Sequence, residues 1–178
     1  MARTARPRLT GGQAAGRPLP RGVPSSARPT SSRVREAIFS ILGHDLEGLS
    51  VLDAFGGSGL LSLEAWSRGG QVVCVERNGG AVRAIRANVD GLGASVQVVR
   101  ADVLTWARGR AEPFDLVLVD PPYALDASPI LAGLAPLVGD RLLLEGAASA
   151  PAPSVPSGLA MVRDRCYGDT VVRVYRRG

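Results

Sequence analysis

The chain has 178 residues, of which 46% are hydrophobic and 21% are charged, and these values suit a single globular domain. No apolar run approaches the roughly 18 residues that cross a bilayer, and the basic, proline-containing start lacks the apolar core of a signal peptide. The two cysteines, Cys74 and Cys166, and the single His44 are not spaced as metal ligands. We therefore expect a cytoplasmic protein with no membrane partner, no disulfide framework and no metal site.

The positive charge is concentrated in the first 35 residues. All 21 basic residues are arginines, and this segment contains eight of them and no acid. The rest of the chain contains the other 13 arginines and all 16 acids. Because the guanidinium group binds phosphate oxygens and stacks on bases, this distribution favours a nucleic-acid partner. An organellar transit peptide is the alternative, but five prolines in the first 30 residues disfavour the amphipathic helix that such peptides form.

Residues 1–30 are interrupted by prolines and glycines, which predicts a basic, hairpin-like arm rather than a helix. We expect this arm to contact nucleic acid and to lie outside the folded domain, residues 31–178. Removing residues 1–27 should then leave the fold intact. A helix should begin at Thr30 or Ser31, since both residues are good N-caps, and should end at Gly43.

After residue 43 short β-rich runs alternate with helical stretches. We expect strands at 50–55, 71–76, 96–101, 116–120, 141–145, 159–163 and 170–176, and helices at 60–67, 80–91, 104–110 and 128–137. This alternation predicts an α/β fold, a Rossmann-like, doubly wound, seven-stranded and mostly parallel sheet. The turn-like link at 167–170 is too short for a helical crossover, so the last two strands should form an antiparallel C-terminal hairpin.

Three strand ends carry a pattern that suits a nucleoside, because ligands of such sheets bind at the carboxyl ends of the strands. The first strand leads into a glycine-rich turn, residues 53–59, where missing Cβ atoms let the backbone approach a ligand. The second strand ends in an acid that can accept hydrogen bonds from ribose hydroxyls, and the third is followed by an acid and an apolar residue that suit adenine. The candidate cofactor-binding residues are Asp53, Phe55, Gly57, Ser58, Gly59, Glu76, Arg77, Asp102 and Val103.

Two other nucleotide sites are disfavoured. Ser62 stands where the dinucleotide motif Gly-x-Gly-x-x-Gly needs its third glycine, so a pyrophosphate site is not expected. A P-loop needs a lysine, and the chain has none.

The fourth strand ends in Asp120, Pro121, Pro122 and Tyr123. Two consecutive prolines fix φ and remove two amide donors. They make a stiff corner that presents the Asp120 carboxylate and the Pro121 carbonyl as acceptors beside an aromatic ring. These four residues are the candidate catalytic residues.

With this corner the sequence resembles the S-adenosylmethionine-dependent amino-methyltransferases, and within them the bacterial 16S ribosomal RNA guanine-N2-methyltransferase family. Besides the corner and the glycine turn, the resemblance rests on segments 11–20, 28–36, 63–65, 75–76 and 167–170. It implies S-adenosylmethionine as cofactor and ribosomal RNA as partner, within a small ribosomal subunit or its assembly intermediate. In the arm and just after it, Arg8, Arg17, Arg28 and Arg33 are the candidate RNA contacts. Relatives typically have alanine where this chain has Gly56, which we expect to add flexibility.

The resemblance also implies a mechanism, in which Asp120 and the Pro121 carbonyl accept the two hydrogens of a base amine while Tyr123 stacks on the base. Two alternatives remain open. One is a DNA adenine or cytosine amino-methyltransferase, although the 55 residues after Tyr123 leave no room for a target-recognition domain. The other is a non-catalytic RNA-binding module with a decayed pocket. Carbon-5 methylation is not expected, because neither cysteine is placed to act as its nucleophile.

Overall fold

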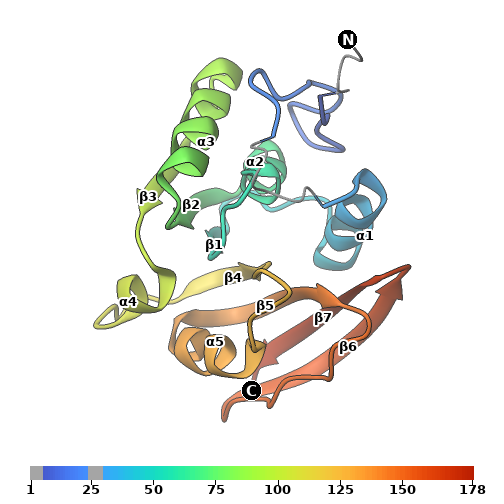
Figure 1. The fold of residues 1–178 in the computed structure, drawn as a ribbon, viewed down its shortest axis with the longest axis vertical. Helices are drawn as coiled ribbons and strands as arrows, with labels where there is room; N and C mark the ends of the chain where they lie inside the picture. The colour runs from blue at the N-terminus through green and yellow to red at the C-terminus, as the bar shows by residue number, and fades with distance from the viewer. Residues whose placement is uncertain (1–5, 24–29) are drawn as a thin grey trace.

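A computed structural model describes residues 6–23 and 30–178 as a seven-stranded sheet with helices on both faces (Figure 1). The elements in chain order are α1 (Ser32–Leu42), β1 (Ser50–Asp53), α2 (Leu60–Ser67), β2 (Gln71–Glu76), α3 (Gly79–Leu92), β3 (Val96–Arg100), α4 (Val103–Ala107), β4 (Phe114–Val119), α5 (Ala127–Leu134), the 3-10 turn η1 (Ala135–Leu137), β5 (Val138–Ala147), β6 (Leu159–Tyr167) and β7 (Thr170–Arg177). As predicted, the Ser31 hydroxyl caps α1, and Gly43 ends that helix.

The strand order β3-β2-β1-β4-β5-β7-β6 confirms the predicted sheet. Strands β1 to β5 pair in parallel, whereas β7 runs antiparallel to both β5 and β6. The predicted hairpin is therefore present, but β6 continues to Tyr167, four residues beyond the predicted end. Its end was missed because the residues of this edge strand are mostly exposed, so no apolar alternation marks them.

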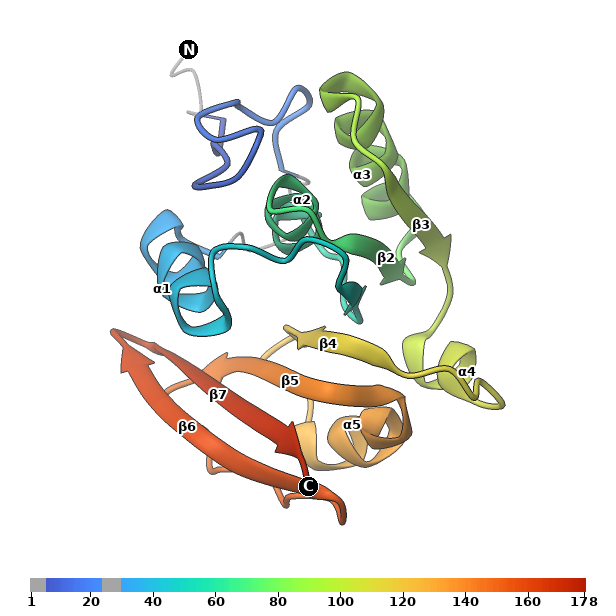
Figure 2. The ribbon, with the colours of Figure 1, turned by 180° about the vertical axis from the view of Figure 1, so that it is seen from behind.

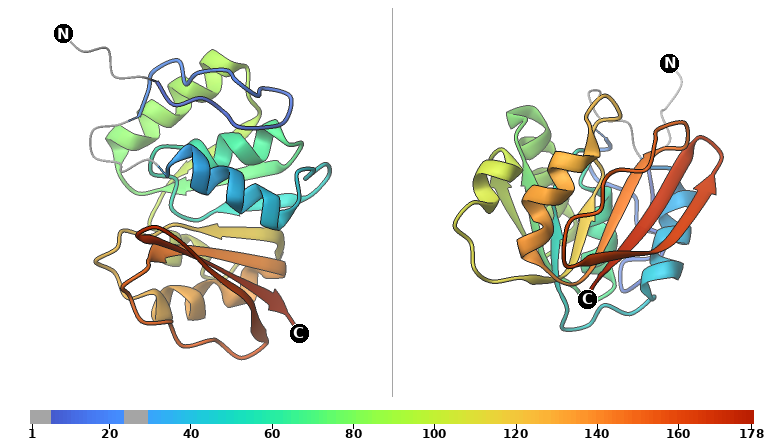
Figure 3. Two further views of the ribbon diagram at one scale, coloured as in Figure 1. Left: turned by 90° about the vertical axis from the view of Figure 1, so that its right-hand side faces the viewer. Right: turned by 90° about the horizontal axis from the view of Figure 1, so that it is seen from below.

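The helices divide between the two faces of the sheet. Apolar residues of α1, α2 and α3 pack on the face that carries Val51, Val72 and Leu116, and those of α4 and α5 pack on the opposite face. Figure 3 shows α1 and α5 on opposite sides of the sheet. Both faces are covered, which explains why the central strands are continuous apolar runs. No helix in the described part of the chain is long and apolar enough to cross a membrane.

The N-terminal arm, of which residues 6–23 are described, packs against α2 and α3 (Figure 2). An antiparallel bridge joins Arg8 to Pro18, and the arm buries Leu9 and Leu19, with exposed fractions of 2% and 0%. Its backbone is also bound to the helices, since the Gln13 amide donates to the Ser67 carbonyl at 2.6 Å. The expectation that the arm lies outside the folded domain is therefore wrong. Its few apolar residues have no periodic spacing, so the sequence shows no sign of their burial.

A buried carboxylate joins the arm to two helices. Glu64 in α2 is ion-paired with Arg35 of α1 at 2.9 Å and with Arg68 at 2.5 Å, and it accepts a hydrogen bond from the Thr10 amide at 2.9 Å. The Arg35 guanidinium also donates to the carbonyls of Arg8 and Thr30, at 2.7 and 2.6 Å. Arg35 therefore fixes the arm and the start of α1, and its charge is not part of the basic surface.

Leu19→Ala should destabilise the protein by about 2–5 kcal/mol, because it removes a fully buried side chain from the contact between the arm and α3. Urea unfolding would measure the loss. Arg21→Ala is the matched control, since this exposed side chain lies two residues away on the same segment. Equal stability of the Leu19 variant and the wild type would show that the arm adds nothing to the core.

Candidate active site

Two of the predicted acids lie on one face of the sheet because of the strand register. Asp53 ends β1 and pairs with Leu118 of β4, and Asp120 follows β4 two residues after Leu118. Since side chains alternate along a strand, Asp53, Leu118 and Asp120 project to the same side, which α1 covers. The two carboxylates therefore meet at the carboxyl edge of the sheet.

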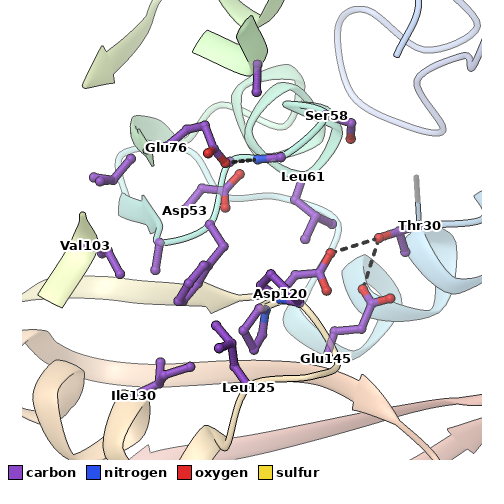
Figure 4. A pocket seen from close by; sticks show the side chains of 18 of the residues that line it. Thr30, Asp53, Ser58, Leu61, Glu76, Val103, Asp120, Leu125, Ile130 and Glu145 are labelled. Carbon is purple, nitrogen blue, oxygen red and sulfur yellow. Dashed lines mark hydrogen bonds between the residues drawn. The ribbon is translucent and has the colours of Figure 1, made fainter. Parts of the chain in front are cut away.

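One cavity of about 690 Å³ occupies this edge (Figure 4). Its lining brings together all of the predicted catalytic residues and all but one of the predicted cofactor residues. The exception is Gly59, the N-cap of α2, which has a φ of 77° and where an added Cβ would lie 3.1 Å from Ile85. The lining also includes polar residues that the sequence analysis did not select as site residues, among them Thr30 and Glu145. Within residues 6–23 and 30–178, no three acids, histidines or cysteines gather in a way that could hold a metal ion.

Glu76 holds the glycine turn in place. One of its carboxylate oxygens accepts a hydrogen bond from the Gly57 amide at 2.8 Å, and the other accepts one from the Asn78 amide at 2.6 Å. A carboxylate oxygen has two lone pairs, so each can accept a further hydrogen bond from a ribose hydroxyl. The side chain is therefore pre-positioned by the backbone that surrounds it.

Asp102 acts as the N-cap of the short helix α4. Its Oδ1 accepts a hydrogen bond from the Thr105 amide at 2.9 Å, and this bond lowers the pKa of the carboxyl group. The next residue, Val103, is buried against the core. A contact of these two residues with adenine stays a prediction, while their place beside the cavity is fixed by the cap.

Gly56 occupies a closely packed position of the turn, and the expectation that it adds flexibility stays a prediction. A Cβ at this position would lie 2.5 Å from the Cys74 Sγ and 3.2 Å from Ile85. The backbone of the turn runs directly over β2, where the Gly56 amide donates to the Val75 carbonyl at 2.9 Å. The absent side chain therefore sets the depth of the turn against the sheet.

Asp53 is the most enclosed acid of the site, with an exposed fraction of 1%. The Ser62 hydroxyl donates to its Oδ2 at 2.5 Å, whereas Oδ1 has no hydrogen-bond partner among the described residues. Burial raises the pKa of Asp53 from 3.8 to about 6, and the charge of Glu76 adds to the rise. A buried oxygen without a partner, beside a cavity, suits a cationic ligand group such as the ammonium of S-adenosylmethionine.

Asp120 shares a hydroxyl partner with a second buried acid. The Thr30 Oγ1 lies 3.5 Å from the Asp120 Oδ2 and 3.1 Å from the Glu145 Oε2 (Figure 4). Burial and the charges of Glu145 and Asp53 raise the pKa of Asp120 well above its usual value. On the other side of the corner, the Tyr123 hydroxyl lies 3.4 Å from the Thr170 Oγ1, so the motif touches the turn of the C-terminal hairpin.

Of the candidate RNA contacts, the three described arginines Arg8, Arg17 and Arg33 are not part of the cavity lining. Arg8 and Arg17 are exposed, and each donates one hydrogen bond to a backbone carbonyl, of Gly16 at 2.7 Å and of Leu92 at 3.1 Å. Arg33 is exposed on α1. Arg28 lies outside the described residues. Their contacts with RNA stay a prediction.

The whole described domain matches a known family. Residues 7–176 match the family described as "Conserved hypothetical protein 95". The chain belongs to this family. It is 31% identical to ribosomal RNA small subunit methyltransferase D of Escherichia coli K12, with 96% of this chain and 89% of that protein covered. It is 32% identical to the putative rRNA methyltransferase YlbH of Bacillus subtilis 168, with coverages of 96% and 98%.

Solved structures agree with this assignment. The putative methyltransferase yhhF of Escherichia coli has a TM-score of 0.84 and 30% identity, with 97% of this chain and 98% of that chain covered. A hypothetical protein of Thermus thermophilus has a TM-score of 0.79 and 32% identity, with coverages of 94% and 98%. The fold is that of class I methyltransferases, and the similarity to methyltransferases indicates S-adenosylmethionine as the methyl donor.

The stability of the Asp53→Asn variant relative to the wild type should increase as the pH rises. The pKa of this carboxyl group rises to about 6 on folding, so the group is harder to ionise in the folded chain than in the unfolded chain. The wild type therefore loses folding stability as the pH rises from the unfolded pKa of 3.8 to the folded pKa, whereas the asparagine variant does not. From about pH 4.5 to about pH 8 the stability difference between variant and wild type should change by about 2 kcal/mol. Urea unfolding without cofactor would measure it, with the exposed Glu112→Gln as control. A difference that does not vary with pH would contradict the buried-acid interpretation.

Proposed function

We propose that this protein transfers a methyl group from S-adenosylmethionine to the exocyclic N2 of a guanine in small-subunit (16S) ribosomal RNA. The observation that carries the proposal is the Asp120 corner, in which a half-buried acid and a proline carbonyl line the cavity. Full-length similarity to ribosomal RNA methyltransferases supports the class of substrate. The RNA is methylated within a small ribosomal subunit or its assembly intermediate.

The cofactor occupies the part of the cavity formed by the first three strand ends. Glu76 accepts hydrogen bonds from the ribose hydroxyls, and Asp102 with Val103 holds the adenine ring. The unpartnered Oδ1 of Asp53 accepts a hydrogen bond from the ammonium group. When bound, S-adenosylmethionine supplies an electrophilic methyl group on a positively charged sulfur. Several acids around the cavity favour this cation over the neutral product, which promotes product release.

Asp120 and the Pro121 carbonyl prepare the base amine for attack. The lone pair of an exocyclic amine is delocalised into the ring, so the nitrogen is a poor nucleophile. When each acceptor takes one amine hydrogen, the nitrogen becomes pyramidal and directs its lone pair at the methyl carbon. The new nitrogen–carbon bond forms as the carbon–sulfur bond breaks, and the Asp120 carboxylate stabilises the positive charge that develops on nitrogen. The resulting ammonium then loses a proton to solvent.

The target base must leave its stack to reach the corner. Tyr123, of which 42% is exposed, provides an aromatic surface at the cavity mouth on which the base can stack. Arg8, Arg17, Arg28 and Arg33 bind the phosphates around the target. Since residues 6–23 of the arm are docked on α2 and α3, Arg8 and Arg17 present a fixed rather than a diffuse positive surface.

Glu76→Ala should weaken the binding of S-adenosylmethionine by roughly 1–3 kcal/mol, because it removes a carboxylate from the ribose hydroxyls. Titration calorimetry on the purified protein would measure the affinity. Glu112→Gln is the control, since this exposed acid is absent from the cavity lining. Unchanged affinity of the Glu76 variant would remove this residue from the cofactor site.

Asp120→Ala should abolish methyl transfer while the affinity for S-adenosylmethionine stays within a few fold, because this carboxylate contacts the amine rather than the nucleoside. The assay incubates the protein with labelled S-adenosylmethionine and, separately, free RNA, small ribosomal subunits and DNA. Nucleoside analysis of each then identifies the product. We expect N2-methylguanosine from the subunits alone. A methylated DNA base, or near-native turnover by the Asp120 variant, would contradict the proposal.

A further inference from the structure

The C-terminal hairpin of β6 and β7 carries exposed arginines that the proposed mechanism does not use. Arg163 and Arg165 lie on β6, the last strand at one edge of the sheet, and both side chains are exposed. Among residues 6–23 and 30–178, neither guanidinium group has a hydrogen-bond or ion-pair partner. Two such groups, two residues apart on a rigid strand, can bind an anionic ligand.

The strand register places both arginines on the face of the sheet that α1 covers. Arg163 pairs with Val174 of β7, and Arg165 pairs with Val172. Both valines are buried in the apolar cluster beneath α1. Since directly paired residues of neighbouring strands project to the same side of a sheet, the two arginines project to this face as well.

The charges of β6 are separated by face. Asp164, between the two arginines, projects to the opposite face, where it is ion-paired with Arg173 at 3.1 Å. Charged residues on an edge strand also prevent pairing with another chain, but that role does not require the two signs to be separated. The arrangement of arginines on one face and the acid on the other favours an anion as the ligand of the α1 face.

A groove between α1 and the hairpin extends this positive surface. Its volume is about 330 Å³. Its lining combines three arginines with three apolar residues, Ile41, Arg141, Val162, Arg163, Val174 and Arg176. Arg141 and Arg176 share one carboxylate, that of Asp140, at 2.9 and 3.1 Å, so the groove keeps a positive charge. Glu36, an exposed acid of α1, lies about 140° around the helix from Ile41 and therefore on another side of it.

The face that carries the arginines leads to the active-site cavity. Tyr167, two residues after Arg165, lines that cavity together with Asp169 and Thr170 of the hairpin turn. A strand rises about 3.3 Å per residue, so Arg163 lies about 13 Å and Arg165 about 7 Å before Tyr167. A chain of phosphates that adjoins a base in the cavity can therefore reach both arginines.

We propose that this face of the hairpin, with the groove beside α1, is a second RNA-binding surface. Arg163 and Arg165 bind phosphates of the single-stranded segment that adjoins the target base. The inference rests on the proposed function in one respect, that the substrate is RNA, whose backbone supplies one negative charge per nucleotide. Figures 1 and 2 both show α1 between the arm and the hairpin, so the RNA contacts the protein on both sides of this helix.

The test removes the two charges. Arg163→Gln/Arg165→Gln should weaken binding to small ribosomal subunits and to protein-free 16S ribosomal RNA on the order of 10-fold at low salt. Filter binding at about 50–200 mM salt also gives the slope of log affinity against log salt, whose magnitude should fall by about 1.4, since each single-strand phosphate contact contributes about 0.7. In the methylation assay the loss should appear in the KM for the subunit rather than in kcat. Equal affinity and slope for the variant and the wild type would overturn the inference.

The matched control is Arg83→Gln/Arg108→Gln, which removes the same charge from two other exposed arginines. Arg83 lies on α3 and Arg108 follows α4, toward the β3 edge of the sheet, which is opposite to β6 (Figure 1). This variant should keep the wild-type slope, because charges so far from the bound segment are screened by salt. An equal loss in both variants would show that net charge alone acts, which overturns the inference. Arg163→Lys/Arg165→Lys keeps both charges and should restore most of the slope.

The other outcomes separate this surface from different roles of the same residues. A loss for intact subunits without a loss for protein-free RNA would identify a ribosomal protein as the partner, and this would overturn the inference. Self-association of the glutamine variant with unchanged RNA affinity would show that the arginines only protect the edge strand, with the same consequence. Thermal unfolding would verify that each variant is folded.

The inference and the proposed function can fail separately. A methylated RNA base other than N2-methylguanosine would overturn the proposed function alone, because phosphate contacts do not depend on which base reacts. N2-methylguanosine with unchanged RNA binding by Arg163→Gln/Arg165→Gln would overturn the inference alone. Methylation of DNA without methylation of RNA would overturn both.

Discussion

The ion-paired Glu64 carboxylate is the interaction on which the arrangement of the site depends. Glu64 forms ion pairs with two buried arginines, Arg35 and Arg68. Arg35 also donates a hydrogen bond to the Thr30 carbonyl. Thr30 in turn places its hydroxyl against Asp120 and Glu145. A chain of polar contacts thus runs from the N-terminal arm to the acids of the cavity. Breaking a buried ion pair costs about 3–5 kcal/mol, so this connection is rigid under ordinary conditions.

In the proposed function, this connection couples two parts of the molecule that bind different components of the RNA. The arm presents arginines to the phosphates and the corner holds one base under that proposal. Because Arg35 contacts both the Arg8 carbonyl and the Thr30 carbonyl, the arm and the start of α1 keep a constant spacing. Because this spacing is rigid, the position of the RNA backbone on the arm determines which base can reach the corner. In the proposed function, recognition of a folded RNA then depends on shape as well as on sequence.

Much of the fold follows from the sequence because its strands are buried on both faces. Apolar runs such as 116–119 and the Ser31 cap give local signals, and the strand-end motifs fall at the edge where parallel sheets bind ligands. Burial of the arm could not be predicted, since Leu9 and Leu19 form no periodic pattern. Glu64 and Glu145 were also missed, because an acid in a helix or a strand usually lies at the surface. For Glu145 a signal existed, since it stands near the carboxyl end of the strand that follows the Asp120 strand, at the edge where the other polar strand ends gather.

The distances in sequence between partners at this site have a consequence for the order of folding. Thr10 and Glu64 are 54 residues apart, Arg17 and Leu92 are 75 apart, and Thr30 and Glu145 are 115 apart. Contacts of such separation form late, since the loop between them must be closed first. During synthesis the arm therefore leaves the ribosome long before the helices that bury it, and the two acids of the cavity meet only after β5 has been made. The part of the cavity that contains both acids is therefore completed late, when β5 joins β4.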